Sequence, residues 1–166
     1  AEYGLLPSEP LMDLNFELDA SGFQVLLDSA IPIVLAPFEI SSKVLLTERE
    51  MDRLQAGDEA ARWLAQPAGD WLAWWKKRFS VDGFYPFDTL AVAYLTSPDW
   101  LTCEDLPVEI QSHPDDVKVP SMGDGAPTKP YLVVSAQLAS ARTVTYCHDV
   151  NPAFRDDLME RLLRRR

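Results

Sequence analysis

Features that mark several common protein classes are scarce in this sequence. It has two cysteines, Cys103 and Cys147, which lie far apart and match no metal or redox spacing. We therefore expect core cysteines rather than a disulfide framework, and a reducing, cytoplasmic location. No apolar run approaches the ~18 residues of a membrane span. No basic segment precedes an apolar one at the start, so the sequence predicts neither a membrane segment nor a signal peptide.

Basic residues are also few. Fifteen lysines and arginines stand against 26 aspartates and glutamates, which gives a formal net charge of -11. A chain of this charge repels a phosphate backbone and an anionic lipid surface. The composition therefore argues against nucleic acid and membranes as partners.

Common catalytic signatures are missing as well. The sequence contains no phosphate-binding glycine loop, no zinc-ligand spacing and no defensible Ser-His-Asp arrangement. Its two histidines, His113 and His148, are expected at the surface rather than in a catalytic site. The chain begins with Ala1 instead of Met, which leaves processing, a trimmed tag and excision from a longer chain open.

An α/β pattern runs through the chain. Asp19 is a predicted N-cap for a helix over residues 20–30, and the apolar run 31–38 is typical of a buried parallel strand. A helix followed by such a strand favours an open sheet flanked by helices. A late group of strands, with antiparallel pairing among them left open, is predicted at residues 106–111, 131–137 and 143–147.

Three further helices follow from local signals. Thr47 and Glu50 fit a capping box, and Asn151 with a proline next to it begins the closing helix. Residues 59–79 carry tryptophans at helical spacing, and Pro67 among them predicts two helical pieces or one kinked helix. These tryptophans fit a base-stacking platform, but the core or a subunit interface is the more common place for them.

Two polar positions stand between apolar residues at the edges of predicted elements. They are Asp13 with Asn15 in MDLNFELD, and Asp88 in YPFDTLAVAYL. An aspartate directly before a helix is usually an N-cap, so the pattern alone favours capping by Asp88.

Three segments together resemble the C-terminal half of the nucleoside hydrolase family, of the inosine/uridine-preferring type. They are MDLNFELDASGFQVLLDSAIPIVLAPFEISSKVLLTEREMDRL, YPFDTLAVAYLTSPDWL and VTYCHDVNPAFRDDLMERL, and FDTLAVAYL is the most specific piece. The resemblance implies the C-terminal part of an open, mostly parallel sheet flanked by helices. Residues 1–166 would then be a single domain or half-domain whose N-terminal half is absent.

For that family the resemblance implies hydrolysis of the N-glycosidic bond of ribonucleosides, with a bound calcium ion and a water activated by an aspartate. Carried over by position, Asp88 would be a calcium ligand that also holds a ribose hydroxyl. Asn15 would bind ribose hydroxyls, and Asp13 would lie near the 5′ end of the sugar. Such a grip on the ribose diol could orient the sugar and stabilise positive charge developing at its anomeric carbon.

The chain departs from the family pattern at two positions. Phe87 stands where many members carry a histidine that protonates the leaving base. Some purine-preferring relatives carry an aromatic residue there and rely on stacking, so a purine nucleoside fits. Pro7 replaces a sugar-contacting asparagine and offers no side-chain hydrogen bond.

The family's aspartate-rich start is not in the chain. Since that motif supplies the general base and most calcium ligands, we expect no catalytic residue in this chain, and calcium binding only with the N-terminal half present. The main hypothesis is that this chain is half of a nucleoside N-ribohydrolase that is completed by the missing half. The expected protein partner is that N-terminal half or a homo-oligomer partner. The alternative is a non-catalytic, hydrolase-related binding or structural protein, and a third is a self-standing domain whose resemblance is incidental.

Overall fold

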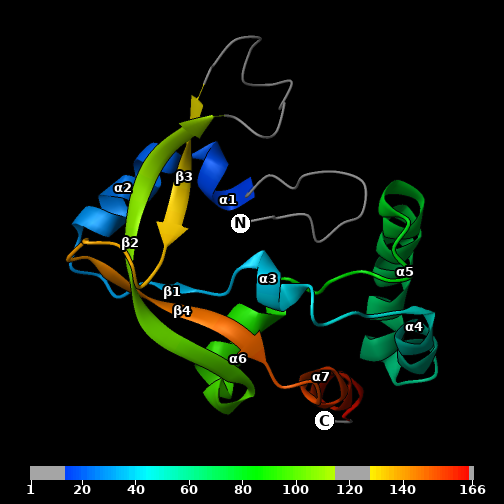
Figure 1. Ribbon diagram of the computed structural model, residues 1–166. Coiled ribbons are helices and arrows are strands. Elements are labelled where there is room, and N and C mark those ends of the chain that lie inside the picture. The colour runs from blue at the N-terminus through cyan, green and yellow to red at the C-terminus, as the bar shows by residue number, and fades with distance from the viewer. Residues whose placement is uncertain (1–13, 115–127, 165–166) are drawn as a thin grey trace. The chain divides into compact units, whose positions relative to one another are not determined.

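The computed structural model of the chain describes residues 14–114 and 128–164. Its strands form one sheet in the order β1-β4-β2-β3, with helices around it (Figure 1). The strands are β1 (Val34–Leu35), β2 (Leu101–Pro114), β3 (Thr128–Val134) and β4 (Thr143–Val150). β1 pairs parallel with β4, and β2 pairs antiparallel with β3. The α/β prediction is confirmed, and the late strands β2 and β3 are antiparallel.

The chain divides into two compact units by its internal contacts. Unit one consists of Ala1–Leu35 and Cys103–Tyr146, and unit two of Ala36–Thr102 and Cys147–Arg166. The expectation of a single domain or half-domain stays a prediction.

Two helices precede the first strand in unit one, α1 (Leu14–Leu18) and α2 (Ala20–Asp28). Asp19 caps α2 as predicted, because its Oδ1 accepts a hydrogen bond from the Gly22 amide at 2.8 Å. On α2, Leu27 is buried while Leu26 remains 43% exposed, so the predicted apolar face is only partly used. The core of this unit is formed by Leu27, Val108 and Val144 with the partly buried Phe23, Ile33, Leu35, Ile110, Leu132 and Val134.

The strand predicted over residues 31–38 is much shorter in the structure. Only β1 is extended and paired, in the register Val34↔Thr145 and Leu35↔Tyr146. β1 lies at the edge of the sheet, and Ile31 is 58% exposed. The parallel pairing was predicted correctly, whereas burial of both faces was not, since Val34 is 37% exposed and Leu35 only partly buried.

Helix α1 was not predicted, and a buried ion pair holds it in place. The Lys129 Nζ lies 3.0 Å from both carboxylate oxygens of Glu17, and both side chains are buried. Phe16 packs edge-on against Phe23 at 5.5 Å between ring centroids. Five residues form too short a pattern for a helix prediction, and α1 is stabilised by these tertiary contacts instead.

Unit two is mostly helical. Its elements are α3 (Phe38–Ser41), α4 (Glu48–Gln55), α5 (Glu59–Phe79), α6 (Thr89–Thr96), the 3₁₀ turn η1 (Pro98–Trp100) and α7 (Phe154–Leu163). The predicted capping box is present, since the Thr47 amide and hydroxyl both donate to Glu50 Oε2, at 2.9 and 2.6 Å. The closing helix α7 begins slightly later than predicted, after a turn in which Asn151 Oδ1 accepts from the Ala153 amide.

Helix α5 runs without a break through Pro67, so the two-piece alternative is wrong. Asp58 caps it, accepting from the Ala61 amide at 3.0 Å, and Ser80 ends it in the left-handed conformation. Trp75 is buried, as a core tryptophan should be, while Trp63 is 76% exposed. Sequence spacing placed these residues on a helix but did not identify which of them face outward.

Two composition-based expectations can also be compared with the structure. Cys147 is buried, as predicted, but the expectation of free core cysteines is wrong, because Cys103 and Cys147 are each disulfide-bonded. Within residues 14–114 and 128–164, no helix combines the length and apolar character needed to cross a membrane.

Candidate functional site

The segment that leads to Asp88 is fixed at its start by a short backbone bridge in unit two. Leu46 and Phe84 exchange both N–H···O bonds at 2.9 Å. Gly83 permits this approach, because a Cβ atom at that position would lie 2.5 Å from the Leu46 carbonyl oxygen. The bridge therefore determines where the chain enters the loop that carries Phe87 and Asp88.

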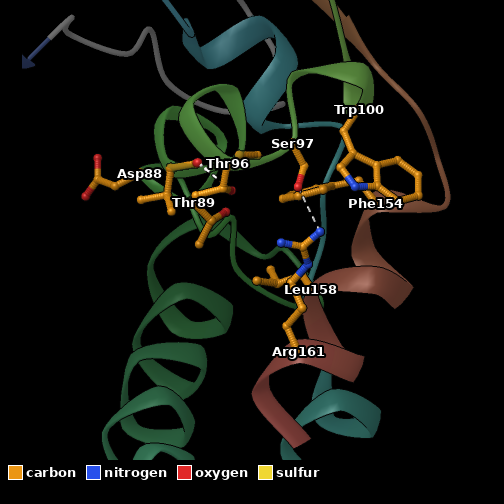
Figure 2. A pocket seen from close by; sticks show the side chains of 10 residues that line it. Asp88, Thr89, Thr96, Ser97, Trp100, Phe154, Leu158 and Arg161 are labelled. Atoms are coloured by element: carbon orange, nitrogen blue, oxygen red, sulfur yellow. Dashed lines mark hydrogen bonds between the residues drawn. The ribbon is translucent and has the colours of Figure 1, made fainter. Parts of the chain in front are cut away.

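Asp88 occupies the N-cap position of α6, but its side chain makes no capping hydrogen bond. The Thr89 hydroxyl and amide both bond to the Pro86 carbonyl, at 2.5 and 3.0 Å. The Asp88 side chain is exposed, and its carboxylate points away from the neighbouring side chains in Figure 2. The capping interpretation of Asp88 is wrong, since the helix begins without using this carboxylate.

Phe87 lies half-buried in an aromatic cluster. Its ring is 5.7 Å from Phe38, 5.8 Å from Trp75 and 6.2 Å from Tyr85, measured between centroids. Burial raises the pKa of Tyr85 above its usual value. The cluster holds the Phe87 ring in a defined orientation directly before Asp88.

A cavity of about 250 Å³ lies against helix α6 in unit two. Arg161 Nη2 donates to Ser97 Oγ at 2.9 Å, and Arg161 Nε donates to Asp157 Oδ2 at 2.6 Å. The cavity is lined by Asp88, Thr89, Val92, Ala93, Thr96, Ser97, Trp100, Phe154, Leu158 and Arg161 (Figure 2). It is smaller than the ~300–1,000 Å³ of typical ligand pockets. Because the Asp88 carboxylate points away from it, we do not assign it as the place where Asp88 would meet a ligand.

The other predicted site residues lie elsewhere in the chain. Asn15 lies on α1 in unit one and is exposed, directly before Phe16 and Glu17, whose side-chain contacts anchor the helix. Asp13 falls outside the described residues, as does Pro7. Phe87 and Asp88 therefore lie next to each other in unit two, and Asn15 belongs to unit one.

A calcium site does not follow from these side chains alone. Calcium takes six to eight oxygen ligands, and Asp88 supplies one carboxylate. Within the part of the chain that the structure describes, no group of three or more His, Cys, Asp and Glu side chains could hold a metal ion. The described residues therefore do not fit a complete calcium site, and calcium binding stays a prediction for the completed protein.

Sequence reasoning did not single out the surroundings of Phe87. Phe38 and Trp75 come from α3 and α5, and Tyr85 lies two residues before Phe87. Aromatic residues in YPFD could have suggested a local cluster, but the contribution of Phe38, nearly fifty positions away, required the tertiary structure.

The arrangement of helices and sheet is that of a nucleoside hydrolase. A solved plant nucleoside hydrolase, the PpNRh1 enzyme, is similar in fold, with a TM-score of 0.76 over 94% of this chain and 49% of that one, at 14% sequence identity. The model of the family described as inosine-uridine preferring nucleoside hydrolase matches residues 7–153. The chain belongs to this family.

Two curated relatives are similar over part of the sequence. A probable ribonucleoside hydrolase of Dictyostelium discoideum is 26% identical over 110 residues, covering 62% of this chain and 32% of the relative. An uncharacterized protein of Schizosaccharomyces pombe is 27% identical over 108 residues, covering 62% and 34%. The chain thus spans about a third of the length of these relatives and about half of the plant enzyme.

Proposed function

We propose that this chain forms part of an enzyme that hydrolyses the N-glycosidic bond of ribonucleosides, a nucleoside N-ribohydrolase that needs an N-terminal half for activity. The family model over residues 7–153 supports this class of reaction. The assignment of a site rests on one observation, which is that the carboxylate of Asp88 makes no capping hydrogen bond. This carboxylate lies in the most family-specific segment of the chain, and helix α6 makes no use of it.

In this proposal the chain contributes ligand-binding side chains rather than the general base. Asp88 binds calcium and a ribose hydroxyl, Asn15 binds ribose hydroxyls, and Asp13 lies near the 5′ end of the sugar. Carboxylate and amide groups suit a ribose diol because they accept hydrogen bonds from its hydroxyls. The missing half supplies the aspartates that complete the calcium site and activate water.

Phe87 offers a flat apolar surface next to Asp88, which favours a purine base over a pyrimidine because the larger ring system stacks over more area. Phenylalanine cannot donate a proton, so the leaving base would have to be activated in another way. The proposed substrate is therefore a purine ribonucleoside such as inosine. A cytoplasmic location and a homo-oligomeric partner remain predictions.

The intact mass of the natural protein is the first measurement to make. A longer polypeptide, or a second subunit with an aspartate-rich start, is the expected result and supplies the complete assembly. That assembly is then assayed with inosine in the presence and absence of calcium. No hydrolysis of inosine, adenosine or uridine by the complete, calcium-loaded assembly would overturn the proposal.

The Asp88→Ala variant tests the site within the same assembly. Loss of a ligand to both metal and sugar should lower kcat/KM for inosine by at least about 100-fold, a size typical of removing a transition-state contact. Asp58→Ala is the matched control, because Asp58 is an aspartate in the same unit that caps a helix. Equal activity of both variants would contradict the assignment of Asp88.

A further inference from the structure

A buried ion pair in unit one fastens helix α1 to strand β3. The Nζ atom of Lys129 lies 3.0 Å from both carboxylate oxygens of Glu17, and the two side chains are 3% and 6% exposed. Neither residue is among those for which the family resemblance implies a role. Because one ammonium bonds to both oxygens of one carboxylate, the pair restricts where Glu17 can lie.

Lys129 is itself held on its strand. Its ammonium lies 4.8 Å from the centroid of the Tyr131 ring, which is a cation–π distance. In the antiparallel ladder of β2 and β3, Lys129 stands opposite His113 and Tyr131 stands opposite Gln111. The cation therefore has a defined place on a paired strand, and the Glu17 carboxylate is held next to that place.

The helix that Glu17 anchors also carries Asn15. Successive residues of an α-helix point about 100° apart, so Asn15 lies about 200° around the helix from Glu17 and faces away from the ion pair. The burial agrees with this geometry, because Asn15 is exposed while Phe16 is 3% exposed and packs against Phe23 of α2. Holding Glu17 inward therefore fixes the outward direction of Asn15.

We propose that Glu17 and Lys129 are positioning residues for sugar binding. The pair sets the place and the rotation of α1, and α1 in turn sets the side-chain amide of Asn15. This inference rests on the proposed function, in which Asn15 binds ribose hydroxyls. An amide that must both donate to and accept from neighbouring hydroxyls needs a defined orientation, and the ion pair supplies it.

Stability alone is a weak reason for this pair. Taking two charges out of water is costly, so apolar side chains of similar size often stabilise a protein as well as a buried ion pair or better. Orientation is different, because a hydrogen-bonded pair has a preferred distance and direction. A five-residue helix is also too short to keep its conformation unaided. The contribution that an apolar pair would not replace is therefore the direction of α1.

Small displacements of α1 are enough to affect a substrate. Hydrogen bonds weaken steeply as their geometry departs from linear, and a misplacement of about 1 Å caused by a change far from the chemistry can cost about 100-fold in rate. Without the ion pair the Asn15 amide would occupy a wider range of positions. A sugar contact that is made equally in the ground state and the transition state then weakens, which raises KM more than it lowers kcat.

Hydrogen exchange of the 166-residue chain tests the anchoring without any assay of activity. The double variant Glu17→Leu with Lys129→Met replaces the ion pair by an apolar contact. We expect the amides of residues 14–18 to exchange at least about tenfold faster in it, with exchange in α5 unchanged. The control, Lys43→Gln with Asp149→Asn, removes an exposed ion pair of unit two and should leave α1 unchanged. Equal exchange of α1 in the apolar variant and the unmodified chain would overturn the proposal.

A mutant cycle in the complete assembly tests whether the pair acts through Asn15. With inosine, Asn15→Ala and the apolar double variant should each lower kcat/KM about tenfold, mostly through KM, and their combination should lower it little further. In the control background, Asn15→Ala should keep its full effect. Losses that multiply, or an apolar variant as active as the unmodified assembly, would overturn the positioning role and leave the proposed function standing. No hydrolysis by the unmodified assembly would overturn the proposed function and the positioning role with it.

Glu17→Gln repeats the cycle with a milder change, for the case that the apolar variant does not fold. It preserves the size of the side chain and one oxygen that accepts from Lys129, while the charge is lost. We expect kcat/KM to fall about threefold, again with little further loss when Asn15→Ala is added. A loss that multiplies with that of Asn15→Ala would overturn the positioning role in this variant as well.

Discussion

Among the residues that the structure describes, Asp19, Asp58 and Asp88 each stand directly before a helix, but only the first two cap it with their side chains. Asp19 and Asp58 accept from backbone amides at 2.8 and 3.0 Å, whereas Asp88 accepts none from α6. A carboxylate that its helix does not need is available for a ligand.

This difference predicts the stabilities of three alanine variants. Asp19→Ala and Asp58→Ala should each lower the free energy of unfolding by about 1 kcal/mol, the usual loss for a cap. Asp88→Ala should change it by less than about 0.5 kcal/mol, since no capping bond is lost. Urea denaturation of the 166-residue chain measures all three. A loss at Asp88 equal to the other two would mean that its carboxylate caps α6 in solution.

The Glu17–Lys129 pair makes a second prediction for single residues. Lys129→Met leaves the Glu17 carboxylate buried without its main partner and should cost about 3 kcal/mol or more. The double variant Glu17→Leu with Lys129→Met should recover most of that loss, because no charge is then buried. Urea denaturation of the single and double variants measures the coupling. Equal stability of the two would show that the pair contributes nothing specific.

At the scale of elements, the capping box of α4 gives a pH dependence. Burial by itself raises the pKa of Glu50, but the hydrogen bonds from Thr47, with a contribution from the nearby Arg155 charge, outweigh it and lower the pKa below its usual value. A carboxyl group with a lowered folded-state pKa stabilises the protein above its unfolded pKa of about 4.3, and this stabilisation is lost as the pH falls through the folded value.

Glu50→Gln should therefore be less stable than the unmodified chain at pH 7, by about 0.5 kcal/mol, and the difference should shrink as the pH falls below the unfolded pKa of about 4.3. Thermal unfolding of both proteins between pH 7 and pH 3 measures this. A difference that grows as the pH falls would contradict the lowered pKa.

Gly83 gives a prediction for the loop that carries the candidate site. A methyl group at Gly83 would press on the Leu46 carbonyl, so Gly83→Ala should cost about 1–3 kcal/mol. Gly69→Ala is the matched control in the middle of α5, where an added Cβ meets nothing within 4 Å. That variant should gain about 0.5–1 kcal/mol, because glycine is a poor helix residue. Similar changes in both melting temperatures would contradict the importance of the bridge.

At the scale of the whole molecule, the proposed calcium site needs ligands from an N-terminal half. We expect that millimolar calcium does not raise the melting temperature of the 166-residue chain, because Asp88 alone cannot coordinate the ion tightly. The same titration on the assembly with the N-terminal half should raise it. Differential scanning fluorimetry with and without a chelator measures both, and a clear shift for the isolated chain would mean that its own residues form a calcium site.

Local interactions made a large share of the fold predictable. Asp19, Thr47 and Glu50 act within one helical turn, so their roles are contained in a few neighbouring residues. The spacing of apolar side chains likewise located α5, which extends over the predicted residues 59–79. The segment FDTLAVAYL pointed to the family that the comparisons show.

Features that depend on distant neighbours could not be obtained from the sequence. The five-residue α1 depends on Lys129, 112 positions away, and the short length of β1 depends on which residues pair with β4. Capping by Asp88 was favoured by its place before a helix, whereas the structure shows that the first turn is satisfied without it. By itself the sequence determined most of the longer helices, the caps at Asp19 and Thr47, and the family, because these are encoded by local spacing and side-chain chemistry. The tertiary structure alone decided which aspartate at a helix start makes no capping bond and which tryptophans face outward, because both depend on the contacts that the rest of the chain does or does not make.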